Sequence, residues 1–514
     1  MKFALLPFAG RNFPNALPEA ATGIDNARET AERGRAVEAE GGFWVGLGGD
    51  MFVCSANGKW NAIAERLEIA SPSDAGRKSD LHLVMQTGRG FQNAYPDAHV
   101  LADKGRYLIV EFDRAEAQEL GDSRAPLFAI RPLPENAVVY APRPRRGVDR
   151  LPAPAVMAAV AAVTRPDFEA AVTRLASFTT RLSTSADFRA AAEWARARFE
   201  ALGLAARTSG IAVGSAASLN VIATKAGTGA QAGAVLVVAH LDSVNHGGGA
   251  SAAAPGADDN ASGAAGVLTL AAAMAPHEFA HDLVFILFGG EEQGLLGSRQ
   301  YIAELPEAER RRIRAVLNMD MIGCVNSQPP TVMLEGAALS QGIIDALAEA
   351  AEAHTTLAIQ TSLNPFASDH VPFIEAGIPA VLTIEGADSA NEAIHSGHDT
   401  LDRLDMDYAT QVLRMNAGWL AAEAGIAAAS QPDTVPGGMP GNLPVPPAGC
   451  GCGCGAGVSP AEASAKVHRN QVTGHYQALF AQYARLNRDG RLSPGDRAEW
   501  QSALLACGQL DQPR

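Results

Sequence analysis

Short apolar runs alternate with longer segments of helical periodicity between residues 152 and 430, and this alternation limits the possible folds most. The runs that predict buried strands are residues 234–239, 283–288, 315–319 and 379–384. The segments that predict helices are residues 168–179, 186–202, 261–274, 295–305, 342–353 and 408–428. Strands that alternate with helices form parallel sheets that are covered on both faces. We therefore predict an α/β fold with a mostly parallel mixed sheet and helices on both faces.

Residues 1–150 have a different character, with short β-branched stretches separated by Gly, Pro and Asp. This pattern predicts a small mixed or β-rich N-terminal unit, followed by a second unit at residues 151–430. No motif in the first unit assigns a chemistry to it, so its role stays open. The arginine-rich residues 142–147 predict a connector. Cleavage there would make the first unit a removable prosegment, and the plainer interpretation is a solvated linker.

Beyond residue 430 the sequence predicts a linker and a tail. Residues 431–458 are rich in Pro, Gly and Cys, which is typical of a flexible linker. Residues 459–514 have the apolar spacing of a helical tail. Cys450, Cys452 and Cys454 alternate with glycine, a spacing that can bind a soft metal, but no second pair of ligands accompanies them. The linker interpretation is therefore favoured, and six cysteines in 514 residues do not indicate a disulfide scaffold.

Composition and charge restrict the partners of the chain. Hydrophobic residues make up 47% and charged residues 19%, which indicates a globular protein, and 514 residues favour two or more folded units. The net charge of −15 argues against nucleic acid or an anionic membrane as a partner, because either needs clustered Lys and Arg. No apolar run approaches the roughly 20 residues that span a bilayer. The first ten residues make a poor secretion signal because Pro7 interrupts them, so localisation stays open.

Polar side chains follow three of the predicted strands at the point where each strand ends. His240 ends the strand at 234–239, Glu291 and Glu292 follow the strand at 283–288, and Asp320 follows the strand at 315–319. Because sites in open α/β sheets form beyond the carboxyl ends of the strands, we expect these side chains at one edge of the sheet.

The residue types at this edge match the donors that zinc prefers. Zinc binds imidazole nitrogen and carboxylate oxygen, and a pair of zinc ions needs a bridging carboxylate plus further ligands for each ion. A further carboxylate, free of metal, is needed to accept a proton from the attacking water. Adjacent glutamates at a strand end can divide these two tasks, because neighbouring side chains point in different directions.

Four stretches of sequence together resemble the di-zinc aminopeptidases of peptidase family M28. They are Gly-Ala-Asp-Asp-Asn-Ala-Ser-Gly at 256–263, Gly-Gly-Glu-Glu-Gln-Gly-Leu-Leu-Gly-Ser at 289–298, Ser-Asp-His-Val-Pro-Phe at 368–373, and His-Ser-Gly-His-Asp-Thr at 395–400. The resemblance covers roughly residues 160–428 and implies the zinc exopeptidase fold there. It does not extend to the first unit or to the tail.

The resemblance implies a role for each site residue. It makes two zinc ions the cofactors, with other divalent metals as alternatives, and Glu291 the general base. The implied metal ligands are His240 and Asp320 for one ion, Glu292 and His395 for the other, and Asp259 as the bridge.

Three further implications concern the surroundings of those ligands. Asp242 and Asp399 are placed to orient the two ligand histidines. The peptide bond between Asp259 and Asn260 is cis in relatives, and we expect the same here. The implied activity is aminopeptidase hydrolysis of peptides, by a water that bridges the two metals.

Several alternatives remain at this level. The same scaffold serves carboxypeptidases and dipeptidases, and a single-zinc cyclising enzyme or a non-catalytic binding domain can share the fold. Asp258 can be a helix cap rather than a ligand. Several relatives carry a tyrosine immediately before the last histidine ligand as an oxyanion donor, but this chain has Ile394 there. We expect the donor elsewhere, near residues 364–368. Substrate preference and oligomeric state stay open.

Overall fold

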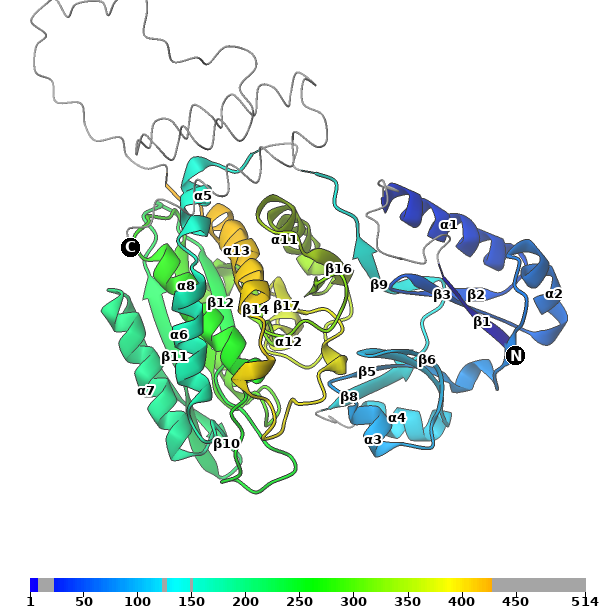
Figure 1. Cartoon of the computed structure of the whole chain (residues 1–514), viewed down its shortest axis with the longest axis horizontal. Coiled ribbons are helices and arrows are strands. Elements are labelled where there is room, and N and C mark those ends of the chain that lie inside the picture. The colour runs from blue at the N-terminus through cyan, green and yellow to red at the C-terminus, as the bar shows by residue number, and fades with distance from the viewer. Residues whose placement is uncertain (8–22, 123–126, 148–150, 428–514) are drawn as a thin grey trace, which may run out of the picture. The chain divides into compact units, whose positions relative to one another are not determined.

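The computed structural model describes residues 1–7, 23–122, 127–147 and 151–427 (Figure 1). The chain up to Ser430 forms one compact unit. The predicted linker at 431–458, with its three glycine-flanked cysteines, and the predicted tail at 459–514 lie outside the described residues. Within the described part, no helix combines the length and the apolar character that crossing a membrane requires.

A large mixed sheet organises the described residues, which confirms the predicted α/β class. Its strands run in the order β10-β11-β13-β12-β14-β17-β15-β16-β9-β2-β3-β1-β4. In the central part β13, β12, β14 and β17 are parallel neighbours, and the edges are antiparallel. The strands of the second half are β10 Ala205–Val213, β11 Ala216–Lys225, β12 Ala234–His240, β13 Asp282–Phe288, β14 Ile313–Met319, β15 Thr331–Glu335, β16 Ala358–Ser362 and β17 Ala380–Glu385.

Helices cover both faces of this part of the sheet, as predicted. Figure 1 shows α6, α8 and α13 side by side along one face. The helices are α5 Pro154–Ala161, α6 Arg165–Ala176, α7 Ala186–Ala201, α8 Gly263–Met274, α9 Leu296–Glu304, α10 Glu307–Arg312, α11 Gln341–His354, α12 His370–Glu375 and α13 Met406–Glu423. Short turns of 3-10 or π helix occur at Lys78–Asp80, Ala257–Ser262, Ala338–Ser340, Asp388–Ala390 and Leu401–Arg403.

Successive side chains of β12 pack into two different hydrophobic cores. Val235 and Val237 point into the larger core with α6, α8 and α13, whereas Leu236 and Val238 point into the core with α9 and α12. All four side chains are buried. Because successive side chains of a strand face opposite ways, a strand buried on both faces reads as a continuous apolar run. This is why residues 234–239 were recognisable from sequence.

Polar caps fix where several helices begin. The Ser185 hydroxyl accepts the Phe188 N–H at 3.0 Å at the start of α7, and Asp405 accepts two backbone N–H groups at the start of α13. Gly203, with φ at +77°, ends the turn that follows α7. These signals explain why the predicted helix boundaries agree with the structure to within a few residues, except that α13 ends at Glu423 rather than 428.

Residues 1–147, here called the N-terminal segment, contribute strands to the same sheet. Its strands are β1 Lys2–Pro7, β2 Phe43–Leu47, β3 Asp50–Ser55, β4 Ser73–Asp74, β5 Leu81–Gln86, β6 His99–Lys104, β7 Tyr107–Glu111, β8 Phe128–Pro132 and β9 Ala137–Arg143. Its helices are α1 Gly23–Ala39, α2 Asn57–Arg66, α3 Gly90–Ala94 and α4 Arg114–Asp122. A separate four-stranded sheet has the order β6-β7-β5-β8.

Strand β9 links the N-terminal segment to the rest of the sheet. It pairs antiparallel with β16, with Ile359 opposite Arg143, and parallel with β2. The predicted connector at 142–147 therefore begins inside a strand. Both sides of the predicted boundary near residue 150 belong to one compact unit, and the division into a first and a second unit stays a prediction.

Candidate metal centre

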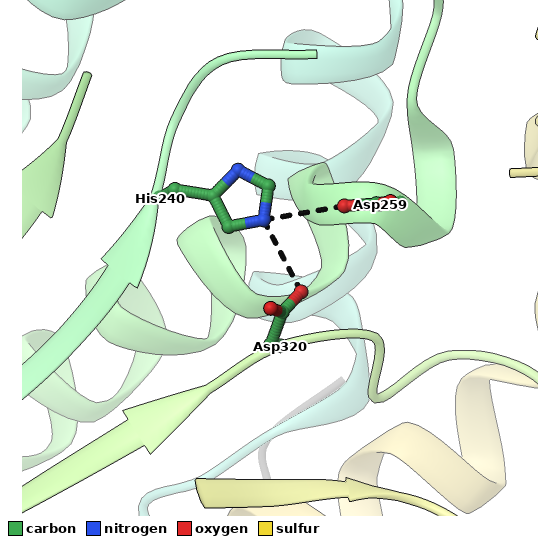
Figure 2. Close-up of side chains that lie close together, drawn as sticks. All are labelled: His240, Asp259 and Asp320. Atoms are coloured by element: carbon green, nitrogen blue, oxygen red, sulfur yellow. Dashed lines mark hydrogen bonds and ion pairs between the residues drawn. The ribbon is translucent and has the colours of Figure 1, made fainter. Parts of the chain in front are cut away.

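His240, Asp259 and Asp320 lie together at the carboxyl edge of the sheet, as expected from the parallel strands that precede two of them (Figure 2). His240 is the last residue of β12 and Asp320 directly follows β14, the parallel neighbour of β12. The Nε2 atom of His240 lies 3.2 Å from Asp259 Oδ1 and 3.2 Å from Asp320 Oδ1. All three side chains are buried.

A second group of three side chains contains Asp259 again, now with Glu292 and His395. The Nε2 atom of His395 lies 3.0 Å from Asp259 Oδ2 and 3.2 Å from Glu292 Oε2. The two oxygens of Asp259 therefore face one histidine each. Glu291 borders the first group, with its Oε2 at 4.0 Å from His240 Nε2. The structure thus brings together all five predicted ligands and the predicted base.

The backbone of Asp259 is held in the π turn Ala257–Ser262. The Asp259–Asn260 peptide is cis, as the resemblance implied. The carboxylate of Asp399 accepts the N–H groups of Asp258 and Asp259, both at 2.9 Å. Asp399 therefore fixes the backbone of Asp259, and its predicted role in orienting His395 stays a prediction. The sequence did not reveal the contact between Asp399 and Asp259, because the two residues are 140 positions apart.

Asp242 performs two tasks near the centre. Its carboxylate accepts the backbone N–H groups of Glu291 and Glu292, each at 3.3 Å. Its Oδ1 also lies 3.6 Å from Nδ1 of His240, and its backbone carbonyl lies 3.2 Å from the same nitrogen. Asp242 therefore lies beside His240, and it also fixes the backbone of the adjacent glutamates.

Asp258 is not a helix cap, which corrects the alternative raised from the sequence. It is fully buried, and its carboxylate accepts the Gly323 N–H at 2.9 Å and the Asn391 amide at 2.8 Å. Asp258, Cys324 and Glu385 also place ligand atoms within 4.8 Å of one another. Glu385 in turn accepts the Cys324 N–H at 2.7 Å, so these carboxylates already have partners within the protein.

The segment that follows β16 supports Asp320 and was only partly recognised. The Ser368 hydroxyl donates to Asp320 Oδ2 at 2.6 Å and accepts from the Asn318 amide at 2.7 Å. The amide of Asn364 donates to the Val139 carbonyl at 2.6 Å. Ser368 and Asn364 therefore have partners within the fold, although this segment was expected to hold an oxyanion donor. Next to Ser368, Asp369 is buried with neither carboxylate oxygen hydrogen-bonded, and sequence reasoning missed it.

Arg181 holds the backbone of segments that adjoin the centre. It is fully buried, and its guanidinium donates to the carbonyls of Leu241 at 2.8 Å, Leu175 at 3.0 Å and Gly256 at 2.9 Å, and also to the carbonyl of Pro255. It thereby ties the end of β12 to the turn that carries Asp259. Burial lowers the pKa of Arg181 to about 10, which still leaves it charged at neutral pH.

The centre carries more negative than positive charge. Burial raises the pKa of Glu292 to about 7 and raises that of Glu291 well above its ordinary value, despite the opposing effect of the nearby histidines. Burial lowers the pKa of His240, but the carboxylates of Asp320 and Glu291 outweigh it and hold that pKa well above its usual range. A cation bound beside these carboxylates would favour their charged forms.

The two groups fit a pair of metal ions. Each offers one imidazole and two carboxylates, and the shared Asp259 can serve both sites. Glu292 Oε1 is buried and has no hydrogen-bond partner, which leaves it available as a further ligand atom. The chemistry of the donors and this unpaired oxygen are what a site for two zinc ions requires.

Ile394 serves in packing, at the position where several relatives carry a tyrosine. It is 9% exposed and belongs to an apolar cluster with residues of the N-terminal segment. Gly88 lies against it, since a Cβ built on Gly88 would come 3.5 Å from Ile394 Cδ1. We expect Ile394→Tyr to lower the free energy of unfolding by about 1–3 kcal/mol through overpacking, with no gain in hydrolysis rate. Denaturant titration beside Ile394→Leu measures this, and a faster Ile394→Tyr enzyme of unchanged stability would contradict it.

The comparisons with known proteins agree with this centre. The model of Peptidase family M28 matches residues 220–420. A probable leucine aminopeptidase of Trichophyton verrucosum is 31% identical over 216 residues, which cover 40% of this chain and 58% of that protein. Aminopeptidase YwaD of Bacillus subtilis is 32% identical over 180 residues, covering 33% of this chain and 36% of that protein. The chain spans about half the length of the curated relatives it matches.

Solved structures of aminopeptidases also resemble this chain, with lower sequence identity than the relatives above. The LapA aminopeptidase of Legionella pneumophila matches with a TM-score of 0.49 and 18% identity, covering 67% of this chain and 98% of that one. BSAP, a zinc aminopeptidase of Bacillus subtilis, matches with a TM-score of 0.37 and 27% identity, covering 41% and 51%. The assignment rests on the family model and on the sequences. Residues 220–420, which contain all five predicted metal ligands and the predicted base, match the model of peptidase family M28.

Proposed function

We propose that this chain is a zinc-dependent exopeptidase, an aminopeptidase that removes N-terminal residues from peptides, and that residues 151–430 carry this activity. The observation that supports it most is the position of Asp259, whose two oxygens lie 3.2 Å and 3.0 Å from the Nε2 atoms of His240 and His395. A carboxylate between two such groups is the arrangement that a pair of metal ions needs.

Zinc is the metal that these donors favour, since imidazole and carboxylate ligands suit it and one relative of the fold is described as a zinc aminopeptidase. In the proposal, His240 and Asp320 hold one ion, Glu292 and His395 hold the other, and Asp259 is shared. Such ions would bring the pKa of a water between them towards neutrality and polarise the scissile carbonyl.

The chain's own residues supply the proton transfers. Glu291 lies beside the first group and directly precedes Glu292 of the second, and it belongs to neither group. It is therefore free to accept a proton from the attacking water and to return it to the leaving amine. The field of bound cations would counter the burial that raises its pKa, and so keep it ionised. Asp242 fixes the backbone of Glu291, which holds the base in place.

Charge favours the N-terminus of a peptide over its C-terminus. When ionised, the carboxylates around the centre carry more negative charge than two dications neutralise. A protonated amine is attracted to this excess of negative charge. The carboxylates at or beside the centre are Asp242, Asp259, Glu291, Glu292, Asp320 and Asp369. A carboxypeptidase or dipeptidase on the same scaffold needs a cation for the substrate carboxylate, and Arg181 is occupied by backbone carbonyls.

Metal analysis with hydrolysis assays tests the proposal. We expect about two zinc ions per chain, release of p-nitroaniline from leucine- and alanine-p-nitroanilide, and loss of that release after chelation with recovery when zinc is restored. The control substrate carries a blocked amino group and should not be cleaved.

Three outcomes would contradict the proposal in different ways. Cleavage of the blocked substrate would exclude an aminopeptidase, and cleavage that requires a free carboxyl terminus would favour the carboxypeptidase alternative. A chain that binds zinc and hydrolyses no peptide of any kind would favour a non-catalytic binding domain.

A further inference from the structure

Arg106 is a buried cation of the N-terminal segment that neither the sequence motifs nor the proposed chemistry use. It directly precedes β7, and it is 3% exposed. Its guanidinium donates to both carboxylate oxygens of Glu335 at 3.0 and 2.9 Å and to Asp388 Oδ2 at 2.9 Å. It also donates to the Phe366 carbonyl at 2.9 Å. All three partners belong to the second half of the chain, 229 to 282 residues away.

Two of the three partners of Arg106, Phe366 and Asp388, lie in segments that lead directly to the candidate metal centre. Phe366 is two residues before Ser368, whose hydroxyl donates to Asp320 at 2.6 Å. Asp388 begins the stretch that ends at His395, and within that stretch Asn391 donates to Asp258 beside the bridging aspartate. One guanidinium therefore joins both of the segments that support the metal ligands.

Both segments contain residues in the left-handed region, where a side chain with a Cβ is disfavoured. Ala367 has φ at +47° and adjoins Phe366, Ala387 has φ at +56° and adjoins Asp388, and His395 itself has φ at +53°. Such conformations persist only where the surroundings hold them. The hydrogen bonds of Arg106 act on the immediate neighbours of two of these three residues.

An apolar cluster strengthens the same connection. Leu83, Met85 and Ile109 of the N-terminal segment share one buried cluster with Phe366 and Ile394. The Ser389 hydroxyl also donates to the Gln86 carbonyl at 3.4 Å. The N-terminal segment thus touches the residue that precedes His395, as well as the segments that Arg106 joins.

The ion pair between Arg106 and Glu335 does not depend on pH in the physiological range. Burial raises the pKa of Glu335, but the Arg106 guanidinium outweighs it and brings that pKa to about 2, so the ion pair is intact at any physiological pH. At the other end of the N-terminal segment, Arg145 donates to the Leu357 carbonyl at 2.8 Å and to carbonyls at the end of α11. A segment bound at both places is poorly suited to removal as a prosegment.

We propose that Arg106 is a positioning residue, through which the N-terminal segment holds the two segments that carry the candidate metal ligands Asp320 and His395. The N-terminal segment is then a standing part of the metal centre rather than an inhibitor of it. This inference rests on the proposed function for its metal, and Arg106 itself lies outside the part of the chain that the family model matches.

The test uses the full chain with the double substitution Arg106→Met/Glu335→Gln, which removes the cation together with its bidentate partner and so leaves less uncompensated charge in the interior. Arg106→Lys is the second variant, because it keeps the charge and loses the forked geometry. Arg145→Met is the matched control. It removes an arginine that ties the same segment to α11 and touches neither supporting segment.

Zinc affinity, measured by competition with a chelator, is the first readout. We expect it to fall about 10- to 100-fold in the double variant, the size that loss of support for metal ligands produces. kcat on leucine-p-nitroanilide should fall by a similar factor with a smaller change in KM. The zinc affinity of Arg106→Lys should lie between those of the double variant and the wild type. Arg145→Met should keep the wild-type zinc affinity even where its melting temperature drops.

Hydrogen exchange of the metal-free chain is the second readout, and it requires neither zinc nor hydrolysis. The amides of residues 386–396 should exchange about tenfold faster in the double variant and at the wild-type rate in Arg145→Met. A folded double variant with wild-type zinc affinity and unchanged exchange would overturn the inference, as would an equal loss in Arg145→Met. A wild-type chain that binds no zinc would refute the proposed function, while the exchange comparison would still decide the role of Arg106.

Discussion

Glu291→Gln is expected to lower kcat about 10²- to 10⁴-fold while the chain keeps its full content of zinc. Glutamine has the same shape as glutamate but accepts no proton at neutral pH, so the substitution removes the base and little else. Glu291 lies 4.0 Å from His240 Nε2 and belongs to neither of the two groups that can hold a metal. Its loss should therefore affect the rate and leave the metal sites intact. Elemental analysis beside steady-state kinetics measures both quantities.

The adjacent residue supplies the matched control for this experiment. Glu292 Oε2 lies 3.2 Å from His395 Nε2 within the second group, so Glu292→Gln should release one zinc ion and lose activity for that reason. Two neighbouring substitutions of the same kind are thus expected to separate chemistry from metal binding. Hydrolysis at the wild-type rate by Glu291→Gln would exclude it as the base, and loss of zinc from that variant would make it a ligand instead.

The parts of this centre that the sequence predicted are the parts that local pattern determines. His240 and Asp320 were recognisable because each ends an apolar strand, and parallel strands bring their carboxyl ends to one edge. Asp259 was recognised by resemblance, in a turn whose cis peptide the structure contains. In each case the signal lies within a few residues of the functional side chain.

The parts that the sequence did not predict depend on contacts between distant residues. Arg106 meets Glu335 across 229 residues, and Asp399 meets the backbone of Asp259 across 140. Nothing beside Arg106 in the sequence distinguishes it from a surface arginine, and only the folded chain buries it. For the same reason the sequence did not reveal that Asp399 accepts the backbone N–H of Asp259.

Some strands were missed for a different physical reason. The strand β10 Ala205–Val213 is mostly exposed, so its sequence lacks the apolar run that marks β12. The strands β15 and β16 are short, and β16 is only partly buried. An apolar run in the sequence indicates that a strand is buried, whereas backbone hydrogen bonding leaves no such pattern. Edge strands and short strands therefore give a weak signal.

Arg181→Leu is expected to lower the free energy of unfolding by about 3–5 kcal/mol, the second large effect that this structure predicts. The guanidinium of Arg181 is fully buried and donates to four backbone carbonyls, among them those of Leu241 and Gly256. Leucine fills part of the volume but donates nothing, and each buried carbonyl left without a partner costs about 1–3 kcal/mol. Denaturant unfolding of the metal-free chain measures the loss without a contribution from bound zinc.

Arg189 provides the control, because it is an exposed arginine whose guanidinium donates to one carbonyl, that of Ala217 at 2.9 Å. Arg189→Leu should leave the unfolding midpoint unchanged, since water can replace its single hydrogen bond. Arg181→Lys should recover part of the stability, because a lysine keeps the charge but reaches fewer of the carbonyls. An Arg181→Leu chain as stable as the Arg189 control would mean that water satisfies those carbonyls. The turn that carries Asp259 would then owe its position to Asp399 and not to the buried cation.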